Sequence, residues 1–557
     1  MKEKISHLLR QAVKSAFSVE TEDIKVEYPT EESHGDYSSN IAMHLTKTLS
    51  IPPAEIAEKL AKLLKKDKLF KEVSVAGPGF INFFISDEAL SAEPETTSNI
   101  GKNKKIVIDF SQPNIAKPLG VHHLLSTIIG QSLYNIYKFL GYDPVGINHL
   151  GDWGTQFGKL TYAYKNWGDK KKIEKNPIDE LLKLYVRFHD EAQADPSLEE
   201  RAREEFKKLE DGDSENTALW KWFCEVSTSE IQKTYDFLGG IHFDHMQGES
   251  FYNDKMDEIL EKGKASGVFE KGEGGALVVK FENDKYPPYL VQKSDGATLY
   301  STRDLAAINY RGKTFHPEKI LYVVDVAQSL HFQQLFETAK RMKLTGAQLV
   351  HVVFGRMQFK DKKMSTRKGN IVLLDEVLKA SVEKAGKIIE EKNPDLKDKD
   401  KVAHKVGVGA VKYAVLSQNR NTNITFDWDK MLSLEGNSAP YLQYSYARAK
   451  SILRKAASSD ASAQQSDSNS ETSTHIRSLV RLFPRFQEVV LLAAEEYKPN
   501  MLANYLHDLA QKFNSFYNSV PVLSSKDREY LLKIVETFSE ILKAGLNLLG
   551  VEVVEEM

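Results

Sequence analysis

A cationic cluster stands where a predicted buried strand gives way to a predicted helix. Residues 106–110, IVIDF, are a short apolar run typical of a buried strand, and a helical pattern of apolar residues follows to about residue 140. Lys117, His122 and His123 lie between the strand and the body of that helix. In an open α/β sheet, ligands bind outside the carboxyl ends of the strands, where a helix N-terminus offers unpaired N–H groups to phosphates. The cluster therefore predicts a phosphate site; the alternative is that both histidines are helix caps or surface residues.

A second cationic segment follows another predicted strand. Residues 362–370, KKMSTRKGN, come soon after the apolar run HVVFG and combine four basic side chains with Ser365, Thr366 and Gly369. A flexible cationic loop of this kind can close over a polyphosphate. Alone it is more often a solvated turn, but its position at a strand end beside the first cluster favours a nucleotide site.

The order of the apolar patterns predicts the α/β class, with a doubly wound parallel (Rossmann-like) sheet at its centre. Residues 1–92 predict a small α+β domain, and a polar stretch typical of a linker follows. Residues 104–403 open with a strand, a helix and a strand, and carry an inserted helical and β segment at about residues 160–290. Residues 404–557 are almost wholly helical and predict an all-α bundle. Within it, residues 457–475 are rich in Ser, Asp and Gln and predict a disordered loop.

The composition excludes several classes of protein. The 557 residues are 41% hydrophobic and 27% charged, and no apolar run approaches the roughly 18 residues of a membrane span. The single cysteine, Cys224, can form neither an internal disulfide nor a thiolate cluster for a metal, so we expect a reducing, cytoplasmic compartment. Residues 1–17 have helical apolar spacing and favour a core helix over a targeting presequence. The net charge of −3 leaves any binding of nucleic acid to local basic strips.

The two cationic segments, in this order after a βαβ opening, resemble the HIGH and KMSKS signatures of class I aminoacyl-tRNA synthetases. Longer stretches resemble arginyl-tRNA synthetase much more closely, and together they cover nearly the whole chain. They are HGDYSSNIA and AGPGFIN near the start, PNIAK, STIIG, GDWGTQFGKL, KSDGATLYSTRDLA and YVVDVAQSLHF in the central region, and EGNSAPYLQYSYARAKSILRK in the last region.

The resemblance implies ATP-dependent ligation of L-arginine to tRNA(Arg) through arginyl-adenylate, with release of AMP and pyrophosphate. Its partners would be tRNA(Arg), L-arginine and ATP with Mg²⁺ as a substrate complex, with no tightly bound protein metal, no membrane and a monomeric chain. The family usually needs tRNA to be present for the activation step, and we expect the same here. No covalent enzyme intermediate is required.

Arginine presents a planar guanidinium with five N–H donors, which carboxylate and amide oxygens meet best. Asp304 follows Tyr300 by four residues and would share its helical face. The resemblance assigns Tyr300, Asp304 and Gln328 to the guanidinium, Asn114 to the α-amino and carboxylate end, and Asp109 to the same arginine site. The alternative for Tyr300 and Asp304 is an aromatic core residue beside a surface carboxylate.

The first signature departs from the family pattern of His, an apolar residue, Gly and His, because it reads GVHH here. The last histidine is kept as His123. His122 stands where the usual glycine lets the adenine ring lie against bare backbone, so we expect His122 to crowd the adenine. ATP would bind at Gly120, His122, His123 and Met364. The resemblance assigns catalysis to His123, Lys117, Lys363 and Ser365, and Lys117 would compensate for Thr366 at the position of the last KMSKS lysine.

A basic strip with interleaved tyrosines, residues 441–455, is the best candidate for contact with tRNA. It contains no acidic residue, and its cations could track phosphates while its aromatic faces stack on unpaired bases. The alternative is a helix with tyrosines in the core and a solvated basic side. The resemblance assigns tRNA binding to Tyr441, Tyr444, Arg448 and Tyr517, and to Phe80 and Asn82 in the first domain.

Two other functions fit parts of the sequence. The GVHH segment could mark a catalytically impaired paralogue that binds tRNA or arginine without charging, although Asp304, Gln328, Lys117 and Lys363 argue against it. A small-molecule nucleotidyltransferase could use the same sheet, but the basic strip would then have no purpose. Charging of total tRNA with each amino acid would separate all three.

Overall fold

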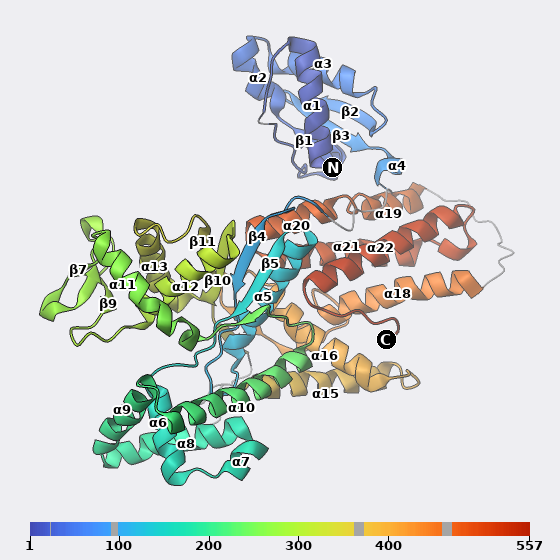
Figure 1. Cartoon of the computed structure of the whole chain (residues 1–557). Coiled ribbons are helices and arrows are strands. Elements are labelled where there is room, and N and C mark those ends of the chain that lie inside the picture. Colours follow the sequence, from blue (N-terminus) through green and yellow to red (C-terminus); the bar gives the residue numbers. More distant parts are fainter. Residues whose placement is uncertain (23, 91–97, 361–372, 459–469) are drawn as a thin grey trace.

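The computed structural model describes residues 1–22, 24–90, 98–360, 373–458 and 470–557. In Figure 1 a small domain at the N-terminal end lies above a helical domain at the C-terminal end, and two further lobes lie on the left and at the lower left of the central sheet. Among the described residues, no helix is both long and apolar enough to cross a membrane.

The central sheet has five parallel strands in the order β11-β10-β4-β5-β6. Apolar runs with little alternation form its strands, as expected where helices cover both faces. The first strand lies at the centre, so the chain reverses its direction of winding between β4 and β10 and opens a crevice at their carboxyl ends. The strands are β4 (Lys105–Asp109), β5 (Asp143–Asn148), β6 (His245–Met246), β10 (Lys319–Asp325) and β11 (Gln348–Phe354).

Successive residues of β4 face opposite sides of the sheet, and each side has its own core. Ile106 and Ile108 pack in the cluster that contains helix α5 (Val121–Phe139). Val107 packs in the cluster that contains α12 (Tyr300–Phe315) and α13 (Ser329–Arg341). Helices therefore cover both faces, which confirms the predicted doubly wound α/β class.

Two excursions leave the sheet. The first, between β5 and β6, is a lobe of helices with its own apolar core: α6 (Thr155–Trp167), α7 (Lys170–Lys175), α8 (Pro177–Ala194), α9 (Ser197–Glu210) and α10 (Ser214–Leu238). The second, between β6 and α12, holds the 3-10 helix η2 (Glu249–Lys255), α11 (Met256–Ala265) and an antiparallel sheet of β7 (Glu270–Lys271), β8 (Leu277–Val279) and β9 (Tyr289–Gln292). The predicted single insertion at residues 160–290 is thus divided by β6. That strand has only two residues, too few to give an apolar run in the sequence.

The N-terminal domain is α+β, with an antiparallel sheet in the order β1-β3-β2. Its tight β2–β3 turn needs glycine, because Gly79 has φ +128° and a Cβ there would lie 2.9 Å from the Pro53 carbonyl oxygen. The elements are α1 (Lys2–Phe17), β1 (Tyr37–Ser39), α2 (Ile41–Leu49), α3 (Pro53–Leu64), β2 (Phe70–Ala76), β3 (Phe80–Ile85) and α4 (Asp87–Leu90).

The last region is a helical domain. A parallel pair of short strands, β12 (Met357–Phe359) and β13 (Ile424–Phe426), links it to the central region. The predicted boundary at residue 404 falls inside α16. The helices of this last region are α15 (Leu374–Lys392), α16 (Lys399–Leu416), α17 (Trp428–Met431), α18 (Ala439–Ser458), α19 (Ser470–Val480), α20 (Arg485–Glu495), α21 (Pro499–Ser519) and α22 (Arg528–Leu548).

The predicted disordered loop at residues 457–475 is wrong at both of its ends. Ala457 and Ser458 complete α18, and residues 470–475 begin α19. Polar residues are tolerated at helix ends, where water can satisfy the backbone, so a polar composition alone did not mark these boundaries. Residues 459–469 lie outside the described part of the chain.

A buried lysine joins the first excursion to the helical domain. Lys412, on α16, is 3% exposed, and its ammonium donates to the Gly239 carbonyl at 2.8 Å and to the Gly550 carbonyl at 2.7 Å. Gly239 follows α10 and Gly550 follows α22, so the cation meets the partial negative charge of two helix C-termini. Burial nevertheless lowers the pKa of Lys412 to about 8.

We expect Lys412→Met to lower the free energy of unfolding by about 2 kcal/mol, because it keeps the apolar stem but leaves two partly buried carbonyls without this donor. Thermal unfolding followed by circular dichroism would measure the change. The control is Lys405→Met on the same helix, whose ammonium pairs with Glu552 at the surface and contributes little. Equal midpoints for the two variants would contradict this account of Lys412.

Candidate active site

A cavity of about 310 Å³ opens at the carboxyl ends of β4 and β10. All five residues predicted for arginine line it, although they come from four separate parts of the chain. Asp109 ends β4, Asn114 lies in the loop after it, Tyr300 and Asp304 begin α12, and Gln328 ends the 3-10 helix η5 (Val326–Gln328) after β10. The crossing point of the sheet, where the winding direction reverses between β4 and β10, therefore brings these residues together.

Asp304 is oriented by a histidine. His331, on α13, lies with its Nε2 2.8 Å from Asp304 Oδ2, and its ring lies 5.1 Å from the ring of Tyr300. Tyr300 is 61% exposed, so its ring forms an open rim of the cavity rather than part of the core. The arrangement presents a fixed carboxylate beside an aromatic face, which suits a planar cation.

The direct contact predicted for Asp109 is not supported. Its carboxylate is buried, with Oδ2 2.7 Å from Nη1 of Arg311 and Oδ1 accepting from the Gln112 amide at 2.7 Å. Both oxygens are thus engaged inside the protein. Arg311 is itself buried between the rings of Tyr252 and Tyr322. Asp109 therefore supports the wall of the cavity.

Glu249 is a site residue that the sequence did not reveal. It lines the cavity at the start of η2, three residues after the end of β6, and its carboxylate lies 3.1 Å from Nη1 of Arg303. Burial raises the pKa of Glu249 to about 7; Asp304 and Asp152 add to the effect and Arg303 opposes it. A carboxylate just beyond a strand end was the available signal, but β6 is too short to be recognised as a strand.

The segment that carries Glu249 is fixed by Asp152. One carboxylate oxygen of Asp152 accepts from the Ser250 N–H at 2.8 Å, and the other accepts from the Ser250 hydroxyl at 2.6 Å. His149, which precedes this aspartate, also lines the cavity and is half-buried there.

The loop between β4 and α5 is strained. Ser111, Gln112 and Ala116 have φ values of 77°, 54° and 61°, in the left-handed region that side chains disfavour. The Ser111 hydroxyl lies 2.7 Å from both the Thr127 and the Tyr235 hydroxyls, so α5 and α10 hold this end of the loop.

The other end of the loop is held from the helical excursion. The Ala116 N–H donates to the Ser227 hydroxyl of α10 at 3.1 Å, and the Lys117 ammonium lies 5.4 Å over the ring of Tyr185 on α8. Lys117 does not line the first cavity. It lines a neighbouring one of about 350 Å³, between the loop, α10 and the start of α15.

His123 differs from the cationic group expected from the sequence. Its Nδ1 accepts the Gly120 N–H at 3.1 Å, and burial lowers its pKa to about 3. The ring is therefore neutral, with its proton on Nε2, so it can act on a phosphate only as a hydrogen-bond donor. The ring of His122 lies 3.9 Å from that of His123, on the exposed side of the helix start. Lys363, Met364 and Ser365 lie outside the described residues.

Three of the residues predicted for tRNA form one patch on α18 and α21. The Arg448 guanidinium lies 4.4 Å from the ring of Tyr444 and 5.1 Å from the ring of Tyr517, and it donates to Asn514 at 2.7 Å. Tyr441 lies on α18 too, half-buried against His507. Cation and aromatic faces are thus combined on one surface, as contact with unpaired bases requires.

The two residues predicted for tRNA in the N-terminal domain differ in exposure. Phe80, at the β2–β3 turn, is 41% exposed and can stack on a base. Asn82 is 5% exposed in the central strand of the sheet, which disfavours direct contact with a macromolecule.

An open parallel sheet with a cavity at its crossing point, beside a histidine-bearing helix start, is the catalytic architecture of class I aminoacyl-tRNA synthetases. Comparison with family models agrees, because residues 86–428 match the catalytic domain of class I tRNA synthetases (R). Residues 3–85 match the arginyl-tRNA synthetase N-terminal domain, and residues 442–557 match the DALR anticodon-binding domain. The chain belongs to the arginyl-tRNA synthetase family, which confirms the resemblance found in its sequence.

Curated relatives and solved structures match over the full chain. The arginine–tRNA ligase of Clostridium botulinum (strain Alaska E43 / Type E3) is 44% identical, covering 100% of both chains, and that of Clostridium perfringens (strain 13 / Type A) is 42% identical, covering 99% of each. The arginyl-tRNA synthetase of Thermus thermophilus has a TM-score of 0.83 at 26% identity over 100% of both chains. That of Plasmodium falciparum has a TM-score of 0.82 at 27% identity, covering 100% of this chain and 99% of its own.

The pKa of Glu249 predicts how binding in the cavity depends on pH. Because the raised pKa of about 7 leaves the group protonated below neutrality, a guanidinium ligand should bind more tightly as the pH rises through 7. We expect L-arginine to bind about tenfold more weakly at pH 6 than at pH 8 by isothermal titration calorimetry. Glu249→Gln should bind weakly at both pH values, and an unchanged pH dependence in this variant would exclude Glu249 as the cause.

Proposed function

We propose that this chain ligates L-arginine to tRNA(Arg), with ATP and Mg²⁺ as a substrate complex, through an arginyl-adenylate. One observation carries the proposal: Asp304, Glu249 and Gln328 line one cavity at the crossing point of a class I catalytic sheet. Two carboxylates and an amide oxygen match the donors of a guanidinium, and the exposed Tyr300 ring supplies an aromatic face.

In the first step the arginine carboxylate attacks the α-phosphorus of ATP. A new P–O bond forms as the bond to the β-phosphate oxygen breaks, and pyrophosphate leaves. The N-terminus of α5 and the neutral His123 ring supply N–H donors to the reacting phosphate, and Lys117 supplies positive charge from the adjoining cavity. Lys363 and Ser365 remain predictions from the sequence for the same step.

In the second step a hydroxyl of the tRNA 3′ end attacks the arginyl carbonyl, and AMP leaves. The patch of Tyr444, Arg448 and Tyr517 would hold the anticodon side of the tRNA, and Phe80 would contact it from the N-terminal domain. The proposal includes the family's need for tRNA during activation, a monomeric chain and a reducing, cytoplasmic compartment.

The alternative of an impaired paralogue rests on the GVHH segment. The hydrogen bond between His123 and Gly120 argues against it, because it places His123 in the first turn of α5, where the last histidine of the signature is expected. The cavity residues are also complete, and a chain released from catalysis has no physical reason to keep them.

Charging of total tRNA with each labelled amino acid, with ATP present, tests the proposal. We expect arginine alone to be incorporated. Asp304→Asn should raise the arginine KM about tenfold or more, because a neutral amide replaces the carboxylate of a charge-assisted pair worth roughly 1.5–3 kcal/mol. Asp257→Asn, on the exposed face of α11, is the matched control and should leave the KM unchanged. Failure to charge arginine would refute the proposal.

The tRNA patch gives a separate prediction. Tyr444→Ala and Arg448→Ala should weaken tRNA binding, and Arg448→Ala should also reduce the slope of log affinity against log salt by roughly one. Filter binding across a salt series would measure both quantities. Arg203→Ala is the control, because this exposed arginine lies on α9, on the other side of the molecule in Figure 1. Equal affinities and slopes for Arg448→Ala and the control would exclude the patch.

A further inference from the structure

The segment HGDYSSNIA, at residues 34–42, has no part in the chemistry described above. It lies in the N-terminal domain, far along the chain from the catalytic loop, and contains β1. In the structure it faces the helical domain rather than the central sheet, because its Gly35 and Asp36 contact Arg477 and Arg481.

The backbone conformation of this segment requires glycine at its second residue. Gly35 has φ +93°, and a Cβ there would lie 2.7 Å from the Phe83 carbonyl oxygen, so only glycine fits. The next residue is bound to the same strand, because the Asp36 N–H donates to the Phe83 carbonyl at 2.8 Å. Asp36 Oδ2 then accepts the Ile85 N–H at 2.8 Å. These contacts aim the carboxylate out of the domain in one direction.

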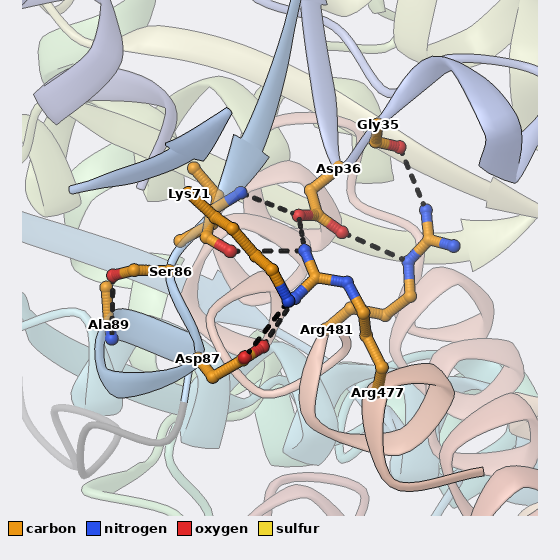
Figure 2. Close-up of polar contacts among 9 residues, drawn as sticks. Gly35, Asp36, Lys71, Ser86, Asp87, Ala89, Arg477 and Arg481 are labelled. Atoms are coloured by element: carbon orange, nitrogen blue, oxygen red, sulfur yellow. Dashed lines mark hydrogen bonds and ion pairs between the residues drawn. The ribbon is translucent and has the colours of Figure 1, made fainter. Parts of the chain in front are cut away.

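Two arginines of the helical domain pair with the Asp36 carboxylate (Figure 2). Arg477 Nη2 lies 2.7 Å from Asp36 Oδ2 and also donates to the Ile85 carbonyl at 3.1 Å, while Arg481 Nε lies 3.5 Å from Asp36 Oδ1. Arg481 also donates to the Gly35 carbonyl at 3.2 Å. Arg477 lies in α19 and Arg481 directly follows its last residue, and the Arg481 N–H still donates to the Arg477 carbonyl at 3.1 Å, so the two side chains lie one helical turn apart on the same face.

Burial makes this contact different from the surface ion pairs of the chain. The Asp36 side chain is 4% exposed, whereas Asp87, which pairs with the other side of Arg477 at 2.5 Å, is 54% exposed. Removing one partner of a buried pair leaves an uncompensated charge, whereas an exposed pair contributes little. Asp36 therefore fixes the relative position of the two domains far more strictly than Asp87 can.

A second contact lies along the same interface. Glu488 on α20 accepts from the Tyr28 hydroxyl, and the Arg485 guanidinium lies 4.1 Å from the Tyr28 ring. The N-terminal domain is thus held on α19 and α20 at two places, and both contacts are polar and directional.

From these contacts we infer that Asp36, Arg477 and Arg481 are positioning residues for tRNA. They hold the N-terminal domain on the helical domain so that Phe80 and the Tyr444–Arg448 patch can engage one tRNA together. The inference rests on the proposed function. Its physical basis is preorganisation: two surfaces held in one frame bind a single ligand more tightly than the same surfaces tethered loosely, without any new contact.

The test compares Asp36→Asn with Asp87→Asn, which removes the exposed carboxylate from the same arginine. Asp36→Asn should raise the tRNA KM about tenfold. The KM values for arginine and ATP, measured at saturating tRNA, should stay within twofold of wild type. Asp87→Asn should leave all three within twofold. An unchanged tRNA KM in Asp36→Asn would overturn the inference, and so would equal losses for all three substrates, since these indicate general unfolding.

Arg477→Lys gives a second variant should Asp36→Asn fail to fold, because lysine keeps the charge but cannot bind Asp36 and the Ile85 carbonyl in the same geometry. Small-angle scattering of the full chain should then show an increased radius of gyration, and filter binding should show weaker tRNA affinity. A wild-type radius together with wild-type tRNA affinity would reject the positioning role. Filter binding does not need charging, so failure of the proposed ligation leaves this arm intact.

Discussion

Charge balance inside the cavity is the constraint on which the site depends. Three carboxylates line it, those of Asp109, Glu249 and Asp304, against two guanidinium groups, those of Arg303 and Arg311. The formal surplus is therefore one negative charge, which matches one guanidinium ligand. The buried Arg311 neutralises the deepest carboxylate and leaves the other two nearer to the opening. Burial is the main reason that the pKa of Glu249 is raised to about 7, and the nearby carboxylates of Asp304 and Asp152 add to it while Arg303 opposes it.

The helical excursion shapes the site without lining the first cavity. Its longest helix, α10, contacts the strained loop through Tyr235 at one end and Ser227 at the other, so left-handed residues persist that would relax in a free chain. The same helix ends at Gly239, whose carbonyl meets Lys412 together with the end of α22. The single helix α10 thus joins the loop between β4 and α5 to the domain that carries the proposed tRNA patch. The geometry of the loop depends on packing well outside the catalytic sheet.

The position of the cavity could be predicted from the sequence, because strand ends and family motifs mark it. The contacts and burial of individual side chains could not be predicted, because they depend on residues far apart in the chain. Asp109 lines the cavity, but its carboxylate also pairs with a buried arginine far along the chain, which the sequence did not indicate. Glu249 was missed because the strand before it has two residues. The charge of His123 was misjudged, because burial of its ring lowers its pKa to about 3. Asn82 lies in a motif that matches the family, but it is buried in the central strand of its sheet. Each case concerns a long-range partner, the burial of a side chain or the length of a strand, which residue type and spacing do not encode.

The contact at Asp36 shows why a protein keeps charges in an interface that apolar residues could stabilise equally well. A buried ion pair adds little net stability, because the cost of desolvating both ions offsets most of their attraction. An apolar interface, however, tolerates sliding and rotation, whereas a carboxylate aimed by its own backbone and met by two arginines allows one arrangement. A fixed arrangement of the two domains favours the binding of a long, rigid RNA that contacts both. A small rotation at the interface would move a distant surface such as Phe80 by much more. Directional pairing at this interface therefore contributes more to the relative position of the two domains than to stability.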